Sequence, residues 1–82
     1  RKMILKPVTS EKAVKMIELD NTILFEIPRQ YKKQEIKLEI ESQFNVKVEK
    51  VRTLIHKNKK FAYVRLNKQN PAIDIATQLG LM

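Results

Sequence analysis

The chain has 82 residues, the size of one compact domain, since hydrophobic cores rarely divide below about 100–150 residues. Its 17 Lys and Arg residues outnumber 9 Asp and Glu residues, and the net charge of +8 favours an anionic partner. The absence of cysteine excludes disulfides, thiolate nucleophiles and cysteine-based zinc sites. We therefore expect a single domain over residues 1–82, with enough apolar residues (43%) to fill a core.

No stretch of the sequence has the composition of a membrane span or a signal peptide. A span needs roughly 18 consecutive apolar residues, and no run in this chain approaches that length. The N-terminus is basic but lacks the apolar run of a signal peptide. Together with the missing cysteines, this favours a cytoplasmic protein without a membrane span.

The first third of the chain predicts a short strand, a helix and a longer strand. Ser10 is suited to cap a helix over residues 10–19, whose apolar residues recur at helical spacing. The helix is expected to end in a turn at residues 20–21. Residues 22–28 are rich in β-branched and aromatic residues and alternate in polarity, so they predict a strand ending at proline. This alternation puts Phe25 on the core face.

Residues 32–44 predict the second helix. Ile36, Ile40 and Phe44 are four residues apart, which places them on one helical face. The apolar residues also alternate as in a strand, but the length and the many Lys, Gln and Glu residues favour a helix. Asn45 is suited to a left-handed cap.

The next segments predict a β-hairpin. Residues 46–57 read as a long strand, and a shift of apolar phase between Val48 and Val51 predicts a bulge. Residues 57–60 form the expected turn, and residues 61–66 the returning strand.

The chain is expected to close with a third helix. Asn70 is suited as its N-cap, Pro71 as its first residue and Gly80 as the residue following its C-cap. The fold class is therefore α+β, with a small, mostly antiparallel sheet flanked by helices. The expected order is short strand, helix, strand, helix, strand, strand, helix.

No group of residues predicts catalysis. His56 is the single histidine and lies beside a basic turn, without a nucleophile in reach along the sequence. Glu35 and Glu39 are expected to form a solvated helical ridge. We expect no enzyme activity, no catalytic residues, no metal ligands and no cofactor.

The basic residues form three clusters. Residues 47–60 carry a net charge of +5, the first fifteen residues carry +4, and residues 29–33 add a third cluster. Such clusters can neutralise nucleic-acid phosphates, and arginine can bind a phosphate with two hydrogen bonds. The alternative is an ordinary solvated charged surface.

Two aromatic residues make the prediction of nucleic-acid binding more specific. Alternation over residues 61–66 puts Phe61, Tyr63 and Arg65 on one face and apolar residues on the other. Such a face can stack bases, and the stretch is similar to the signature of the RNA-recognition motif. A free-standing single-stranded RNA-binding domain is therefore one alternative, and exposure of Phe25, Phe61 and Tyr63 on one face would support it. The alternative is that the helix over residues 10–19 covers this face and Phe61 and Tyr63 pack beneath it.

Six segments of the chain, in their order and spacing, resemble one known family. These segments are Lys6–Ala13, Asn21–Phe25, Phe44–Val48, Val51–Leu54, Lys60–Leu66 and Pro71–Ala76, with two shorter matches at Ile36–Lys37 and Leu79–Gly80. The family is the large-subunit ribosomal protein numbered twenty-three, in its archaeal form. A sheet flanked by helices on both faces would favour this assignment over the RNA-recognition motif.

The family resemblance implies partners. It implies binding to large-subunit rRNA beside the polypeptide exit tunnel, next to the ribosomal protein numbered twenty-nine. It also implies docking of nascent-chain factors such as the signal recognition particle. Bacterial members carry a long hairpin extension, for which the short turn at residues 57–60 leaves no room. This indicates the archaeal or eukaryotic arrangement.

The resemblance also assigns residues. The family's RNA-binding signature falls on residues 60–66, with Phe61 where a second basic residue is expected. The factor-docking element of the family falls on Thr9, Ser10 and Glu11. Together with the basic clusters, the expected RNA-binding residues are Lys12, Lys15, Arg29, Lys32, Lys33, Lys50, Arg52, Lys57, Lys59, Lys60, Tyr63 and Arg65.

Overall fold

The computed structural model describes residues 5–80 of the chain, which contain three helices and four strands. The elements are β1 (Lys6–Pro7), α1 (Glu11–Asp20), β2 (Thr22–Ile27), α2 (Lys33–Phe44), β3 (Val48–His56), β4 (Lys59–Leu66) and α3 (Ala72–Gln78). This is the α+β order predicted from the sequence. Arg1 and Lys2, which contribute to the N-terminal basic cluster, lie outside the described residues.

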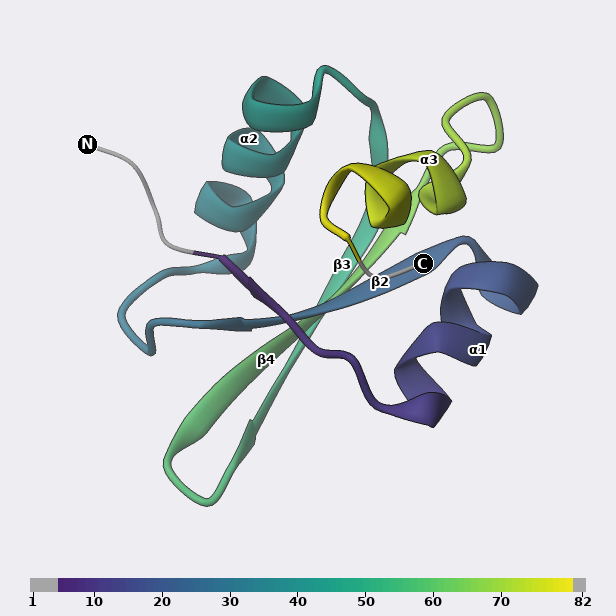
Figure 1. Cartoon of the computed structure of the whole chain (residues 1–82). Helices are drawn as coiled ribbons and strands as arrows, with labels where there is room; N and C mark the ends of the chain where they lie inside the picture. Colours follow the sequence, from purple (N-terminus) through teal and green to yellow (C-terminus); the bar gives the residue numbers. More distant parts are fainter. Residues whose placement is uncertain (1–4, 81–82) are drawn as a thin grey trace.

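The four described strands form one antiparallel sheet in the order β1-β2-β4-β3 (Figure 1). Because β4 is antiparallel to both neighbours, β2 and β3 run parallel on either side of it, with α2 connecting them as in a split β-α-β unit. β1 extends the sheet at the β2 edge. The turn between β3 and β4 projects well beyond the helices (Figure 1).

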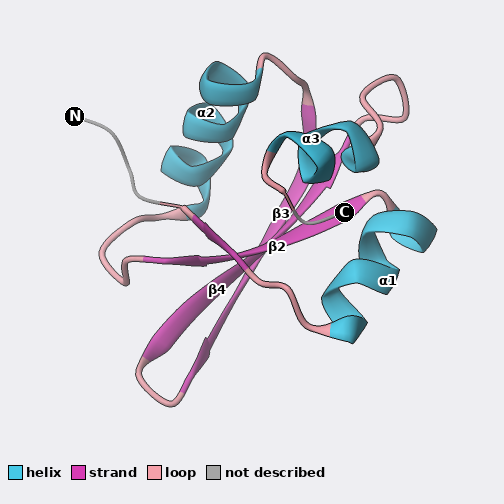
Figure 2. Ribbon diagram, viewed as in Figure 1, coloured by secondary structure: helices cyan, strands magenta, loops and turns pink. Residues whose placement is uncertain are grey.

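One face of the sheet carries the hydrophobic core. Its buried strand residues are Ile23, Phe25, Ile27, Val48, Ala62, Val64 and Leu66. The helices bury against them Ile17, Ile36, Ile40, Ala72, Ile75 and Ala76. α2 and α3 lie over this face, and α1 lies beside the sheet, next to β2 and α3 (Figure 2).

The opposite face of the sheet, here called the outer face, is not covered by a layer of helices within residues 5–80. Helices on both faces, the arrangement that would have favoured the ribosomal family over the RNA-recognition motif, are therefore not found in this part of the chain. The reason is that α1 turns its buried residues, Ala13 and Ile17, toward the core and only borders the outer face. Consequently, the outer face is open where β3 and β4 pair.

Several local predictions are confirmed. Ser10 caps α1, its Oγ accepting a hydrogen bond from the backbone N–H of Ala13 at 3.2 Å. Asn45 ends α2 in the left-handed conformation, with φ of 55°. Gly80 follows the C-cap of α3 with φ of 77°, a value that glycine adopts without steric cost.

The hairpin differs from the prediction at its turn. Lys57 and Asn58 both have positive φ, 52° and 64°, which is typical of a two-residue type I′ turn. Such a turn needs fewer residues than expected, so β4 begins at Lys59. The predicted bulge is confirmed as a register shift between Val48 and Lys50.

The predicted N-cap of α3 is wrong. Pro71 occupies the N-cap position, and the side-chain Oδ1 of Asn70 instead accepts a hydrogen bond from the backbone N–H of Lys47 at 3.0 Å. The backbone N–H of Ala72, the first residue of α3, donates to Oδ1 of Asn21, which lies 51 residues earlier in the sequence. A long-range partner therefore replaces the expected local cap.

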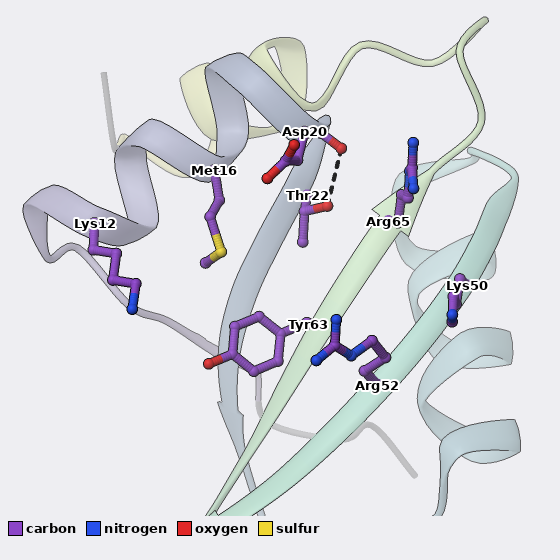
Figure 3. A pocket seen from close by; sticks show the side chains of 8 residues that line it. All are labelled: Lys12, Met16, Asp20, Thr22, Lys50, Arg52, Tyr63 and Arg65. Carbon is purple, nitrogen blue, oxygen red and sulfur yellow. Dashed lines mark hydrogen bonds between the residues drawn. The ribbon is translucent and has the colours of Figure 1, made fainter.

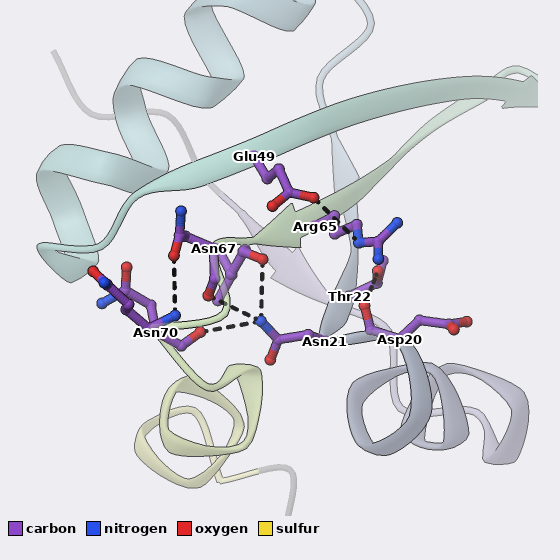
Figure 4. Close-up of polar contacts among 9 residues, drawn as sticks. Asp20, Asn21, Thr22, Glu49, Arg65, Asn67 and Asn70 are labelled. Carbon is purple, nitrogen blue, oxygen red and sulfur yellow. Dashed lines mark hydrogen bonds and ion pairs between the residues drawn. The ribbon is translucent and has the colours of Figure 1, made fainter.

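Asn21 connects three parts of the fold. Its Nδ2 lies 3.1–3.3 Å from the carbonyl oxygens of Leu66, Asn67 and Asn70 and donates to them (Figure 4). Its backbone has φ of 52° and serves as the C-cap of α1, its N–H donating to the carbonyl of Met16. The residue thus ties the end of α1 to the end of β4 and the start of α3.

Candidate nucleic-acid interface

The outer face carries most of the cations expected to bind RNA on the strands. The cross-strand register places residues with outward side chains next to one another. From β2 these are Thr22, Leu24 and Glu26, from β4 Lys59, Phe61, Tyr63 and Arg65, and from β3 Lys50, Arg52, Leu54 and His56. The four Lys and Arg residues among them are exposed, so their charges are available to a partner.

α1 adds a wall to one end of the outer face. Lys12, Met16 and Asp20 are four residues apart and form a stripe along the helix. The stripe faces the sheet across a cavity of about 430 Å³, here called the α1 groove (Figure 3). The other lining residues are Thr22, Lys50, Arg52, Tyr63 and Arg65. Four cations and one carboxylate therefore surround the groove.

Tyr63 is the aromatic residue of the groove. The Cζ atom of Arg52 lies 5.7 Å from the centroid of its ring, within the range of a cation–π contact. The ring is partly exposed and lies between Arg52 and the α1 stripe (Figure 3). An aromatic face and a guanidinium are thus held together beside the recess.

The aromatic platform of an RNA-recognition motif is incomplete. Phe61 and Tyr63 are partly exposed on the outer face, but Phe25 is only 1% exposed and belongs to the core. The outer-face neighbour of Tyr63 on β2 is Leu24. The condition set for the single-stranded RNA-binding alternative is therefore not met.

Arg65 forms an exposed ion pair with Glu49. Its Nε lies 3.6 Å from Oε1 of Glu49, and the two side chains are 54% and 48% exposed (Figure 4). Exposed pairs of this kind contribute little to stability because water screens them. The guanidinium consequently stays available to a second anion.

The lysines at the hairpin turn point in different directions. Lys57 and Lys59 are exposed, and Lys59 continues the outer-face row of β4. Lys60 instead lies on the core side, where its Nζ donates to the backbone carbonyl of Tyr31. The structure therefore separates Lys60 from the outer-face cations.

The remaining predicted cations lie outside the α1 groove. Lys15 is exposed on α1 but is not part of the stripe. Arg29 is exposed in the loop that leads to α2, and Lys32 and Lys33 are exposed at the start of that helix. Since α2 covers the core face, this third cluster begins on the opposite side of the sheet from the groove.

The predicted docking residues are accessible at the beginning of α1. Thr9, Ser10 and Glu11 are all exposed. Ser10 uses its hydroxyl oxygen as an acceptor in the helix cap, which leaves its O–H available as a donor. Capping and docking are therefore compatible at this position.

Three lining residues of the groove were not predicted as functional: Met16, Asp20 and Thr22. The regular four-residue spacing in α1 indicates a shared helical face. It does not reveal that this face lies against the sheet, because the position of α1 depends on contacts with β2 and α3.

Within residues 5–80, His, Asp and Glu form no group of three or more that could hold a metal ion. Over the same residues, no helix has both the length and the apolarity to cross a membrane.

The fold and its surface define a small basic α+β domain with one cationic sheet face. The model of the family described as ribosomal protein L23 matches residues 2–76. The large ribosomal subunit protein uL23 of Caldivirga maquilingensis is 43% identical over 81 residues, which cover 98% of this chain and 94% of that protein. The protein of the same name from Pyrobaculum aerophilum is 42% identical over 81 residues, 98% of this chain and all of that protein.

The chain therefore belongs to the ribosomal protein L23 family. It is a structural constituent of the large ribosomal subunit and not an enzyme. Membership confirms the resemblance and the archaeal type inferred from the six sequence segments, and with them a ribosome-associated, cytoplasmic protein.

Proposed function

We propose that the chain binds large-subunit rRNA as a single unit, using its outer face and the turn of its hairpin. The observation that carries this proposal is the convergence of Lys12, Lys50, Arg52 and Arg65 on one groove from three different elements. Cations that neutralise phosphates release the counterions held by RNA, which favours binding. Family membership supplies rRNA as the polyanion in question.

The rigid sheet supports this function by fixing the spacing of its cations. Phosphate contacts position a protein on nucleic acid, and irregular RNA is distinguished mainly by shape and by unpaired bases. Arg52 and Arg65 occupy adjacent strands at neighbouring register positions, so their guanidinium groups can contact phosphates in a fixed relation. Selectivity for the rRNA site then follows from geometry rather than from total charge.

We further propose that the protein lies beside the polypeptide exit tunnel, next to the ribosomal protein numbered twenty-nine. In this position Thr9, Ser10 and Glu11 would contact nascent-chain factors such as the signal recognition particle. The resemblance of these residues to the docking element of the family and their exposure support this proposal. The element precedes and begins α1, whereas the cations of the groove lie along the helix and on the strands.

The experiment is a salt series with the full chain and a large-subunit rRNA fragment. The logarithm of the affinity falls by roughly 0.7–0.9 per decade of salt for each phosphate contact. Four groove cations each bound to one phosphate therefore predict a slope of about −3 to −4. A flat dependence would show that phosphate contacts do not carry the binding.

A further inference from the structure

We propose that the α1 groove receives one unpaired nucleotide of the bound rRNA. The base would lie against the ring of Tyr63, and the ribose and phosphates would contact the surrounding polar side chains. This inference rests on the proposed function and specifies which part of the RNA occupies the groove. A surface that only bound phosphates would not need such a recess.

The size and walls of the groove fit a compact ligand. A volume of about 430 Å³ lies within the range of roughly 300–1,000 Å³ that is common for small-ligand sites. The Tyr63 ring on β4 gives the recess an aromatic wall, and the Met16 thioether on α1 gives it an apolar wall (Figure 3). Thioethers and aromatic rings both make favourable contacts with flat π-systems.

The polar residues of the groove fit the rest of a nucleotide. Lys12, Lys50 and Arg65 surround the recess and can donate to phosphate oxygens. Asp20 offers a carboxylate that can accept from an exocyclic amino group or a 2′-hydroxyl. The Thr22 hydroxyl is already engaged, donating to the backbone carbonyl of Asp20 at 3.0 Å, so it contributes shape rather than a free donor (Figure 3).

The occupant is expected to be unpaired and single. A base presents its face to an aromatic ring only after it has left the helical stack, which loops and bulges of RNA allow. Phe61 does not line the groove, Phe25 is buried, and Leu24 lies beside Tyr63 on β2. The outer face therefore offers one stacking position in the groove rather than a platform for several bases.

Tyrosine fluorescence provides a direct readout. Tyr31 and Tyr63 are the two tyrosines of the chain, which has no tryptophan, so Tyr31→Phe leaves Tyr63 as the only emitter. In this background we expect quenching by a single-stranded tetraribonucleotide and none by a blunt-ended RNA duplex supplied at the same total concentration of phosphate. Equal quenching by both would overturn the inference, since a duplex does not present a free base face.

A mononucleotide separates the two possible sources of the ligand. If the groove serves an RNA strand, a nucleoside monophosphate should quench Tyr63 only at much higher concentration than the tetraribonucleotide, because flanking phosphates add contacts. Quenching by the mononucleotide at equal or lower concentration would contradict an RNA occupant and indicate a site for free nucleotides.

Matched substitutions on one strand face test the stacking itself. Tyr63→Leu should weaken tetraribonucleotide binding by about fivefold to a hundredfold, the range for removing one base–aromatic stack. Phe61→Leu, the same change two residues away on the outer face, should change it less than twofold, and Tyr63→Phe should preserve binding. Circular dichroism verifies that each variant is folded.

The same variants distinguish the two proposals. If Tyr63→Leu and Phe61→Leu have equal effects while the rRNA fragment still binds with a steep salt slope, the nucleotide site is wrong and the proposed function stands. If the rRNA fragment binds without salt dependence, the proposed function fails, and the groove inference fails with it.

Discussion

Replacing Asn21 with glycine tests how the fold holds the groove together. Asn21 precedes Thr22 of the groove and joins α1, β4 and α3 through its side chain. Its φ of 52° is accessible to glycine without strain, so Asn21→Gly removes the side-chain hydrogen bonds and preserves the backbone conformation. The loss in stability then reports the side chain together with the greater freedom of glycine in the unfolded chain, a contribution that a matched Asn→Gly control shares.

The magnitude follows from the hydrogen bonds. The amide group has two N–H donors shared among three carbonyls, and each hydrogen bond contributes a net value of about 0.5–1.5 kcal/mol. Loss of Oδ1 leaves the N–H of buried Ala72 without a partner, which costs about 1–3 kcal/mol. Because the network is only partly buried, we expect a total of about 2–4 kcal/mol. At about 4–8 °C per kcal/mol for a domain of this size, Tm should fall by roughly 10–30 °C.

Asn45→Gly is the matched control for thermal and urea unfolding. Asn45 has nearly the same backbone conformation, with φ of 55°, but is exposed and makes no side-chain hydrogen bond to the described part of the chain. Its replacement should change the free energy of unfolding by less than about 0.5 kcal/mol. Equal losses in the two variants would refute the assignment of Asn21 as the connecting residue.

Three other predictions concern the hairpin and the start of α1. Lys59→Met should make the salt slope of rRNA binding shallower by about 1. Lys60→Met removes an ammonium that is already bonded to a carbonyl, so it should lower Tm and leave the salt slope unchanged. Lys57→Asn should raise Tm by a few degrees, because asparagine tolerates the positive φ of this turn better than lysine does. Glu11→Gln should weaken binding of purified signal recognition particle to reconstituted subunits several-fold. The control Glu18→Gln changes another exposed residue of α1 and should not weaken it. Equal effects of the two changes would exclude the docking role.

The elements were predictable where local chemistry determines them. Ser10 caps its helix with a hydroxyl that bonds three residues away, and Asn45 ends a helix by its own tolerance of the left-handed conformation. The alternation in β4 also put Tyr63 on the sheet face opposite Ala62 and Val64, because side chains in a strand alternate by geometry, but it did not decide whether a helix covers that face.

The sequence did not reveal contacts that a residue makes with a distant segment, and at the start of α3 this led to a wrong cap. Asn70 has the right chemistry for an N-cap, but its side-chain Oδ1 instead accepts a hydrogen bond from the backbone N–H of Lys47, 23 residues away. Lys60 belongs to a basic run, and a backbone carbonyl 29 residues away accepts a hydrogen bond from its ammonium, so its role in RNA binding stays a prediction. Neither partner can be recognised from spacing along the chain, since both depend on how β2, β4 and the helices pack.

The candidate site was predictable as a set of cations but not as a groove. Charge clustering identified Lys50 and Arg52, strand alternation added Arg65, and pairing of β3 with β4 puts all three on the outer face. The recess itself requires α1 to lie beside β2 with Met16 toward the sheet, which is a tertiary arrangement. The sequence therefore predicts attraction to RNA, and the structure adds where a base can enter.

The claim that the outer face is the rRNA-binding surface is tested most directly by two double variants that lose the same charge. Lys12→Gln with Lys50→Gln removes two groove lysines, whereas Lys37→Gln with Lys68→Gln removes two exposed lysines outside the groove. With the rRNA fragment, the first pair should make the salt slope shallower by about 2 and the second should leave it unchanged. Equal changes in the two slopes would show that net charge, and not the outer face, determines binding.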